Sequence, residues 1–155
     1  MSGRVEQRLA ELGISLPTPT VPAANYVPFV ITGNLVFISG QITMDSGTLK
    51  YQGRLGADMT VDDGYQAARL CGINLLTQLK VACDGDLDRV VRAVKLGGFV
   101  NSTPDFTDQP KVVNGASDLM VEVLGEAGRH ARFAVGAPTL PLGVSVEVDG
   151  VFEIA

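Results

Sequence analysis

The chain has 155 residues, 46% of them hydrophobic and 19% charged, which is enough for one folded domain with a core of its own. Its formal net charge is −5. The average field of such a protein repels a phosphate backbone, which argues against non-specific binding to nucleic acid. No apolar stretch approaches the roughly 20 residues that span a bilayer, and the N-terminus has no apolar signal core. We therefore expect a soluble, cytoplasmic protein without a membrane partner.

The first part of the chain predicts a short helix followed by a β-hairpin. Residues 5–12 carry apolar side chains at helical spacing, and a proline-rich connection follows them. We expect residues 1–22 to form an N-terminal extension of a single domain that spans residues 1–155. Two short apolar runs then flank Gly33-Asn34, a dipeptide typical of a hairpin turn.

The rest of the chain alternates helices with strands. In chain order the predicted elements are a helix over 5–12, strands over 26–32 and 35–39, a helix over 61–83, a strand over 90–100, a helix over 110–124, and strands over 131–137 and 144–154. This order predicts an α+β fold, one mostly antiparallel sheet with two long helices packed on one face. The apolar composition favours burial of the other face by oligomerisation.

The two cysteines, Cys71 and Cys83, lie at opposite ends of the helix predicted over residues 61–83. Twelve residues with a rise of about 1.5 Å each separate them by about 18 Å, far beyond the reach of a disulfide bond. We therefore expect two reduced thiols, as is usual for a protein of the cytoplasm.

The last two predicted strands carry the most informative polar side chains. Ser145, Glu147 and Asp149 alternate with valines, and Arg132 points away from its large apolar neighbours in the preceding strand. The connection over residues 138–143 is short enough for an antiparallel hairpin, which would place Arg132 beside Glu147. One interpretation is a cross-strand ion pair, which contributes roughly 0.2–1 kcal/mol. In the other, Arg132 binds a substrate carboxylate while Glu147 holds a water molecule or moves a proton.

Two further positions have both a structural and a functional interpretation. Ser39-Gly40 ends an apolar strand, where the glycine permits close approach of a ligand or simply lets the chain leave the sheet. His130, the single histidine, lies two residues before Arg132 and either borders a site or occupies the surface or an interface. No zinc-ligand spacing, phosphate-binding loop or dinucleotide glycine pattern occurs, so we expect neither a metal ion nor another cofactor.

At these positions the sequence resembles the RidA (YjgF, L-PSP) family. The matching stretches are Asn25-Tyr26, residues 33–41 with Ser39-Gly40-Gln41, His130-Ala131-Arg132, Leu140-Pro141 and Val146-Glu147-Val148. Their order along the chain is more specific than any one of them. The resemblance implies a chorismate-mutase-like fold and a homotrimer with three clefts between subunits.

The resemblance also implies roles for individual residues. The arginine of the Ala-Arg step binds the substrate carboxylate in that family, which corresponds to Arg132 here. The glutamate of the last strand assists the attacking water, which corresponds to Glu147. Tyr26, Ser39 and Gly40 would line the cleft.

Two departures indicate a divergent branch. Ala134 stands where many members have a cysteine. The cleft asparagine of the family corresponds to Asn114, but about four extra residues separate it from the step Asp105-Phe106. The N-terminal helix is a further difference.

The activity implied by the resemblance is hydrolytic deamination of 2-imino or enamino acids, of the 2-iminobutanoate and 2-iminopropanoate kind, to 2-keto acids and ammonia. The alternative is a non-catalytic trimer that binds or senses a small carboxylate-bearing metabolite. An endoribonuclease or translation inhibitor is a third class, but the acidic charge, the lone histidine and the lack of an aromatic-basic stripe argue against it.

Overall fold

The computed structural model describes residues 3–19, 21–22 and 24–155. Its helices and strands are α1 Arg4–Glu11, β1 Phe29–Thr32, β2 Leu35–Gln41, β3 Met44–Asp45, β4 Thr48–Leu49, α2 Val61–Ala82, β5 Val90–Asn101, α3 Gln109–Leu124, β6 Ala131–Ala137 and β7 Val146–Ile154, with short 3-10 turns at Leu87–Arg89 (η1), Gly125–Gly128 (η2) and Pro141–Gly143 (η3). Each predicted helix and strand is present, with bounds that differ by a few residues at most. Cys71 and Cys83 are free, as expected, and both are buried.

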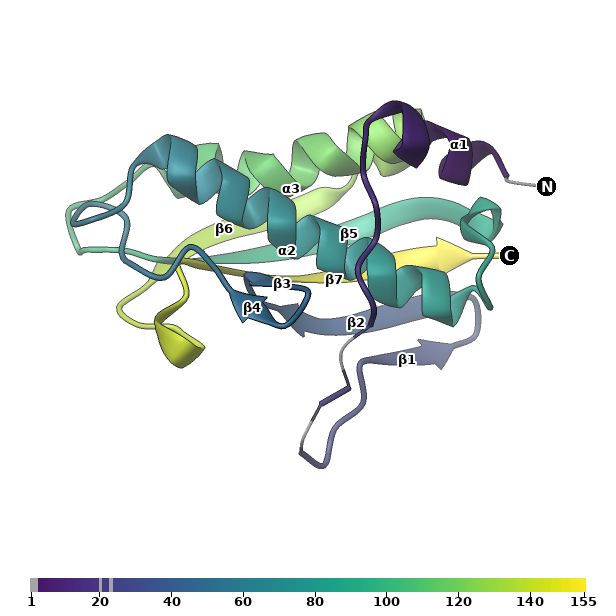
Figure 1. Cartoon of the computed structure of the whole chain (residues 1–155), viewed down its shortest axis with the longest axis horizontal. Helices are drawn as coiled ribbons and strands as arrows, with labels where there is room; N and C mark the ends of the chain where they lie inside the picture. Colours follow the sequence, from purple (N-terminus) through teal and green to yellow (C-terminus); the bar gives the residue numbers. More distant parts are fainter. Residues whose placement is uncertain (1–2, 20, 23) are drawn as a thin grey trace.

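Five strands form one sheet in the order β1-β2-β7-β5-β6, and β3 with β4 forms a separate small hairpin. All neighbours in the large sheet are antiparallel except β5 and β6, which are parallel. Figure 1 shows α2 and α3 side by side on one face of this sheet. The α+β architecture predicted from the sequence, a mostly antiparallel sheet with two helices on one face, is therefore confirmed.

The core lies between this helix pair and the sheet. Alternate residues of β7, among them Val146, Val148 and Phe152, are fully buried there, as the strict alternation of the strand predicts. α2 begins with a capping box in which Thr60 and Asp63 satisfy each other's backbone N–H groups. Within the described part of the chain, no helix is long and apolar enough to cross a membrane.

The predicted hairpin between the last two strands is wrong. β6 lies at the sheet edge and pairs with β5, whereas β7 lies between β2 and β5. The chain leaves β6 on one side of β5, makes the η3 turn, and enters β7 on the other side of β5. The backbone N–H of Ser102 donates to the carbonyl of Ala137, 3.0 Å away, and the N–H of Asn101 donates to the carbonyl of Ser145, 2.8 Å away. These two bonds hold both ends of the connection against the end of β5. A short connection thus joins two strands that are not neighbours.

The two long helices are in close backbone contact at Gly115 of α3. A β-carbon at this position would overlap the carbonyl oxygen of Tyr65 in α2. Gly72 of α2 also faces α3, but the one close contact of its β-carbon would be with the end of the Leu119 side chain, 2.9 Å away, and Ala116 would lie at 3.4 Å or more. The backbone contact at Gly115 therefore fixes the position of α3 relative to α2.

We expect Gly115→Ala to lower the free energy of unfolding by about 1–3 kcal/mol, the usual cost of overpacking, because backbone cannot move aside as a side chain can. Gly72→Ala is the matched control and should change stability by less than about 1 kcal/mol, since the Leu119 side chain can rotate and alanine favours a helix. Urea denaturation measures both variants. A Gly115→Ala protein as stable as wild type would contradict this account of the helix contact.

The N-terminal helix α1 is held by packing and by a cap from another element. Val5 and Leu9 are buried in the main core. The Asp88 carboxylate in η1 accepts hydrogen bonds from the backbone N–H groups of Arg4 and Val5, each 2.9 Å long. These bonds lower the pKa of Asp88 because they favour the charged carboxylate.

We expect Asp88→Ala to speed hydrogen exchange in residues 4–11 while the sheet stays protected. In the wild type, the pKa of Asp88 is lowered, so its charged carboxylate stabilises α1 fully above pH 3.8, the ordinary pKa of an aspartate. This stabilisation is lost as the pH falls below that value. Hydrogen exchange by mass spectrometry measures both effects. Asp84→Ala, which removes an exposed carboxylate paired with Arg89, is the control and should leave α1 protected. Unchanged exchange in Asp88→Ala would show that packing alone holds α1.

Candidate functional site

Arg132 lies on the edge strand β6, and its side chain contacts α3. Its Nη1 donates hydrogen bonds to Oδ1 of Asn114, 2.9 Å away, and to Oγ of Ser117, 3.2 Å away. Its register partner in β5, Leu96, is buried beneath the helices, so Arg132 lies on the helix-covered face. The structure thus brings together Arg132 and Asn114, which the sequence singled out separately. Ser117 was not predicted from the sequence, although its spacing of three from Asn114 on one helix face could have indicated it.

The single histidine, His130, belongs to the same group of side chains. Its Nε2 lies 2.8 Å from Oγ of Ser117, and its Nδ1 lies 2.6 Å from the carbonyl oxygen of Gly128. Burial lowers the pKa of His130; the hydrogen bond to Gly128 acts in the opposite direction, and the charge of Arg132 lowers the pKa further. Of the two interpretations given above, the structure supports a histidine that borders the arginine.

A second group of predicted site residues gathers around the bulged end of β2. Tyr26, Ser39 and Gly40 line one small cavity of about 80 Å³. The Ser39 hydroxyl donates a hydrogen bond to the carbonyl oxygen of Val27, 2.7 Å away, so its proton is already engaged. Ser39 therefore lines this cavity and, through its bond to Val27, holds the segment that carries Tyr26.

Glu147 of β7 adjoins this second group through Gly40. A β-carbon at Gly40 would lie 2.9 Å from Oε2 of Glu147, so the glycine leaves room for the carboxylate. Glu147 is half-buried, and burial raises its pKa, with a further contribution from the negative charge of Asp149. A carboxylate with a raised pKa, next to a small cavity, is a suitable acceptor for a proton from water.

Within one chain Arg132 and Glu147 lie apart, on opposite faces of the sheet. Glu147 alternates with the buried Val146 and Val148 and so faces away from the helices, whereas Arg132 faces α3. Arg132 pairs in register with Leu96 of β5, and Glu147 pairs in register with Phe99, which lies three residues further along β5. With strands about 4.8 Å apart and about 3.3 Å per residue, the two Cα atoms are about 14 Å apart. The expected contact between Arg132 and Glu147 in one chain is wrong, and the cross-strand ion pair is excluded there.

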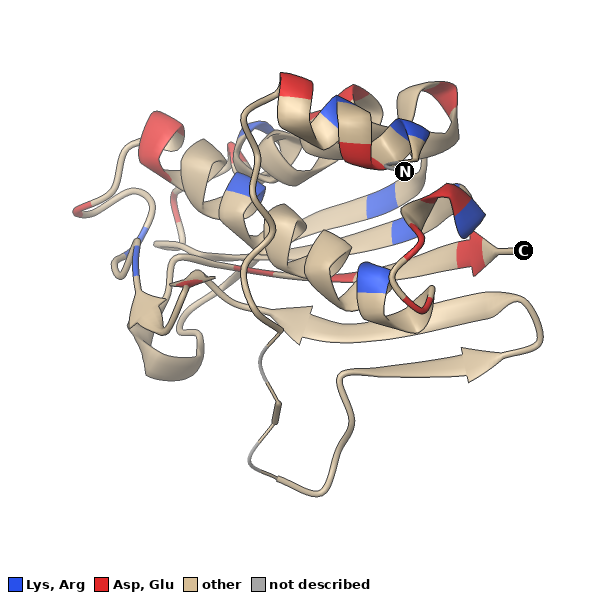
Figure 2. Cartoon of the chain, turned by 45° about the vertical axis from the view of Figure 1, so that its right-hand side comes forward, with Lys and Arg blue, Asp and Glu red and all other residues tan. Residues whose placement is uncertain are grey.

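The face of the sheet that carries Glu147 is uncovered in the single chain and bears a strip of exposed apolar side chains beside its charged residues. Val30, Phe37, Phe99 and Val135 lie on this face, each between 39% and 53% exposed. Figure 2 shows that β1 and β2 carry no charged side chain at all. An apolar strip of this kind across several strands is typical of an interface with another protein chain.

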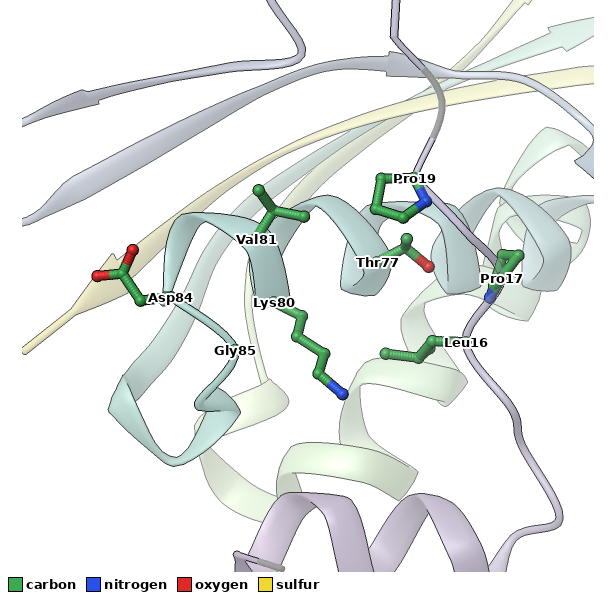
Figure 3. A pocket seen from close by; sticks show the side chains of 8 residues that line it. All are labelled: Leu16, Pro17, Pro19, Thr77, Lys80, Val81, Asp84 and Gly85. Atoms are coloured by element: carbon green, nitrogen blue, oxygen red, sulfur yellow. The ribbon is translucent and has the colours of Figure 1, made fainter.

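A larger cavity, of about 470 Å³, lies elsewhere, between the N-terminal connection and the end of α2. Figure 3 shows Leu16, Pro17 and Pro19 on one side and Thr77, Lys80, Val81, Asp84 and Gly85 on the other. Lys80 forms an ion pair with Glu6 of α1, with 2.8 Å between Nζ and Oε1, and Thr77 donates to the backbone of its own helix. The polar groups of Lys80 and Thr77 in this cavity thus already have partners. We therefore place the candidate site at Arg132 and Glu147, although this cavity is larger than the one beside Ser39. Among the residues described, no three His, Cys, Asp or Glu side chains cluster to hold a metal ion.

Comparison with known proteins agrees with the motifs and the fold. Residues 6–153 match the family described as YjgF/chorismate mutase-like, putative endoribonuclease. Protein TCP17 of Trypanosoma cruzi is 50% identical over 154 residues, which cover 99% of this chain and 96% of that protein. The crystal structure of Atu1372 from Agrobacterium tumefaciens, whose function is unknown, has a TM-score of 0.89 at 51% identity, covering 97% of this chain and 93% of the other.

A putative endoribonuclease from Shewanella oneidensis MR-1 has a similar structure, with a TM-score of 0.94 at 41% identity, covering 98% of this chain and all of the other. The chain therefore belongs to the RidA (YjgF) family, as its motifs indicated, and has the chorismate-mutase-like fold.

Proposed function

We propose that this protein is a hydrolytic deaminase of small 2-imino or enamino acids, with active sites between the subunits of a homotrimer. The observation that carries the proposal is the hydrogen bonding of the Arg132 guanidinium. Its Nη1 is bound to α3, while no acceptor in the described part of the chain occupies Nε or Nη2. These two atoms form one edge of the guanidinium, which matches both oxygens of a carboxylate.

The separation of Arg132 and Glu147 supports a site shared between subunits. A single chain holds the two side chains on opposite faces of its sheet, so a substrate bound to Arg132 must receive Glu147 from another copy. The uncovered apolar face around Phe37 and Phe99 gives a surface on which a second copy can pack. In the proposed assembly, Arg132 and Asn114 of one subunit face Glu147 of the partner subunit across a cleft.

The proposed reaction needs an anchored substrate, a water molecule and one carboxylate. Arg132 binds the substrate carboxylate and so places the imine carbon for attack. Glu147 accepts a proton from water as the oxygen bonds to that carbon, and then returns a proton to the nitrogen of the tetrahedral intermediate. Glu147 then takes the hydroxyl proton of this intermediate and passes it to the nitrogen as the carbon–nitrogen bond breaks, which releases ammonia and leaves a 2-keto acid.

We expect Arg132→Ala to lower kcat/KM for 2-iminobutanoate by about 100-fold, because hydrogen bonds to charged groups each contribute about 1.5–3 kcal/mol. An amino-acid oxidase generates the imine in situ, and 2-keto acid and ammonia release are measured with and without the protein. Arg129→Ala is the matched control, since that exposed arginine pairs only locally with Glu126, and it should keep wild-type activity. Glu147→Gln should lower kcat.

The same experiment can reject the proposal. A folded trimer that accelerates no imine, of any side chain, would not be a deaminase. Melting-temperature shifts with 2-keto acids would then support the metabolite-binding alternative. Unchanged turnover in Arg132→Ala would overturn the assignment of the carboxylate anchor even if wild type is active.

The raised pKa of Glu147 predicts the acid side of the pH profile. A base must be deprotonated, so kcat/KM should fall as the pH drops through a pKa above the ordinary value of 4.5. Asp149→Asn removes the neighbouring negative charge that helps to raise this pKa. The acid limb of the variant should therefore lie at lower pH than in the wild type. A limb that stays in place, or moves to higher pH, would show that Glu147 is not the titrating group.

A further inference from the structure

Ser117 and His130 form a hydrogen-bonded pair beside Arg132, and the proposed reaction assigns no role to either. The direction of each hydrogen bond follows from the chemistry of the partners. The Gly128 carbonyl can only accept, so Nδ1 of His130 carries the proton. Nε2 is then the acceptor and takes the hydroxyl proton of Ser117, 2.8 Å away. The lone pairs of the Ser117 oxygen are therefore left for Arg132.

Both hydrogens of one guanidinium nitrogen are used by this arrangement. Nη1 of Arg132 has two hydrogens; one is directed to Oδ1 of Asn114 and the other to Oγ of Ser117. Asn114 and Ser117 are three residues apart on one face of α3, and His130 lies just before β6, two residues from Arg132. Helix α3, the start of β6 and the connection that holds His130 against Gly128 thus bring four side chains together.

We propose that Ser117 and His130 are positioning residues that hold Arg132 ready for a carboxylate. His130 fixes the hydroxyl of Ser117, and Ser117 together with Asn114 fixes Nη1, so that the Nε–Nη2 edge has one orientation before a ligand arrives. Arginine has a long, mobile side chain, and fixing it in advance reduces the ordering cost of binding. This inference rests on the proposed role of Arg132 as the carboxylate anchor.

Burial supports an uncharged His130 in this role. The half-buried imidazole lies beside a guanidinium, and both conditions disfavour a second positive charge. A neutral ring keeps Nε2 as an acceptor, which the orientation of the Ser117 hydroxyl requires.

We expect Ser117→Ala to raise KM for 2-iminobutanoate by about tenfold, the effect of losing one hydrogen bond to a charged group, with kcat changed by less than about twofold. Ser117→Thr keeps the hydroxyl and should restore the wild-type KM. His130→Phe keeps a ring but loses the acceptor, and should raise KM in the same direction. Asp118→Asn, the neighbouring change on α3, is the control and should leave KM unchanged.

A double-variant cycle shows whether Ser117 acts through Arg132. In the Arg132→Ala background, Ser117→Ala should have no further effect on KM, whereas a general effect on folding would lower activity again. Additive effects, or a Ser117→Thr variant as impaired as Ser117→Ala, would overturn the inference.

Binding of 2-oxobutanoate, measured by calorimetry, separates this inference from the proposed function. If Arg132→Ala leaves binding unchanged, the anchor itself is wrong and both ideas fail. If Arg132→Ala weakens binding and Ser117→Ala does not, only the positioning role fails. Weaker binding in both variants, without turnover, would support the positioning role in a binding protein.

Discussion

The backbone contact between α2 and α3 at Gly115 is the constraint on which the site depends. Both long helices must share one face of a five-stranded sheet, and the absence of a side chain at Gly115 lets α3 lie against the carbonyl of Tyr65. α3 is then held above the β5–β6 edge, where Asn114 and Ser117 reach Arg132. A helix displaced by the width of one methyl group would lose these hydrogen bonds, because their geometry tolerates little change in distance. Packing in the core therefore decides the position of the guanidinium.

The second consequence of one-sided packing is the uncovered face. Because both helices cover the same side, Phe37, Phe99 and Val135 are left to solvent in the single chain. The carboxylate of Glu147 lies on that face, whereas the guanidinium of Arg132 lies on the other. Assembly through the apolar face would cover it, and we propose that it also completes the site. The uncovered face, the proposed assembly and the proposed shared site thus all follow from the placement of both helices on one side of the sheet.

The structure also shows where the two departures from the family pattern lie. The longer interval between Asp105-Phe106 and Asn114 includes the first residues of α3, and the asparagine still contacts Arg132. Ala134, which replaces a common cysteine, lies beside Gly98 of β5 and takes little room. The pair Ser117 and His130 supports the arginine from behind, a contact that no single motif indicates.

The sequence by itself determined the local elements, since alternation, helical spacing and the turn at Gly33-Asn34 depend only on neighbouring residues. It also indicated Arg132, Glu147, Tyr26 and Gly40 individually, through motifs. Only the tertiary structure decided that β6 pairs with β5 and not with β7, because a short connection limits the distance between strands but not which strands become neighbours. Apolar side chains occur on both faces of this sheet, so alternation could not tell which face of β6 meets the helices. The hairpin expected between the last two strands placed Arg132 beside Glu147, whereas the packing of α3 on β5 and β6 places it beside Asn114 and Ser117.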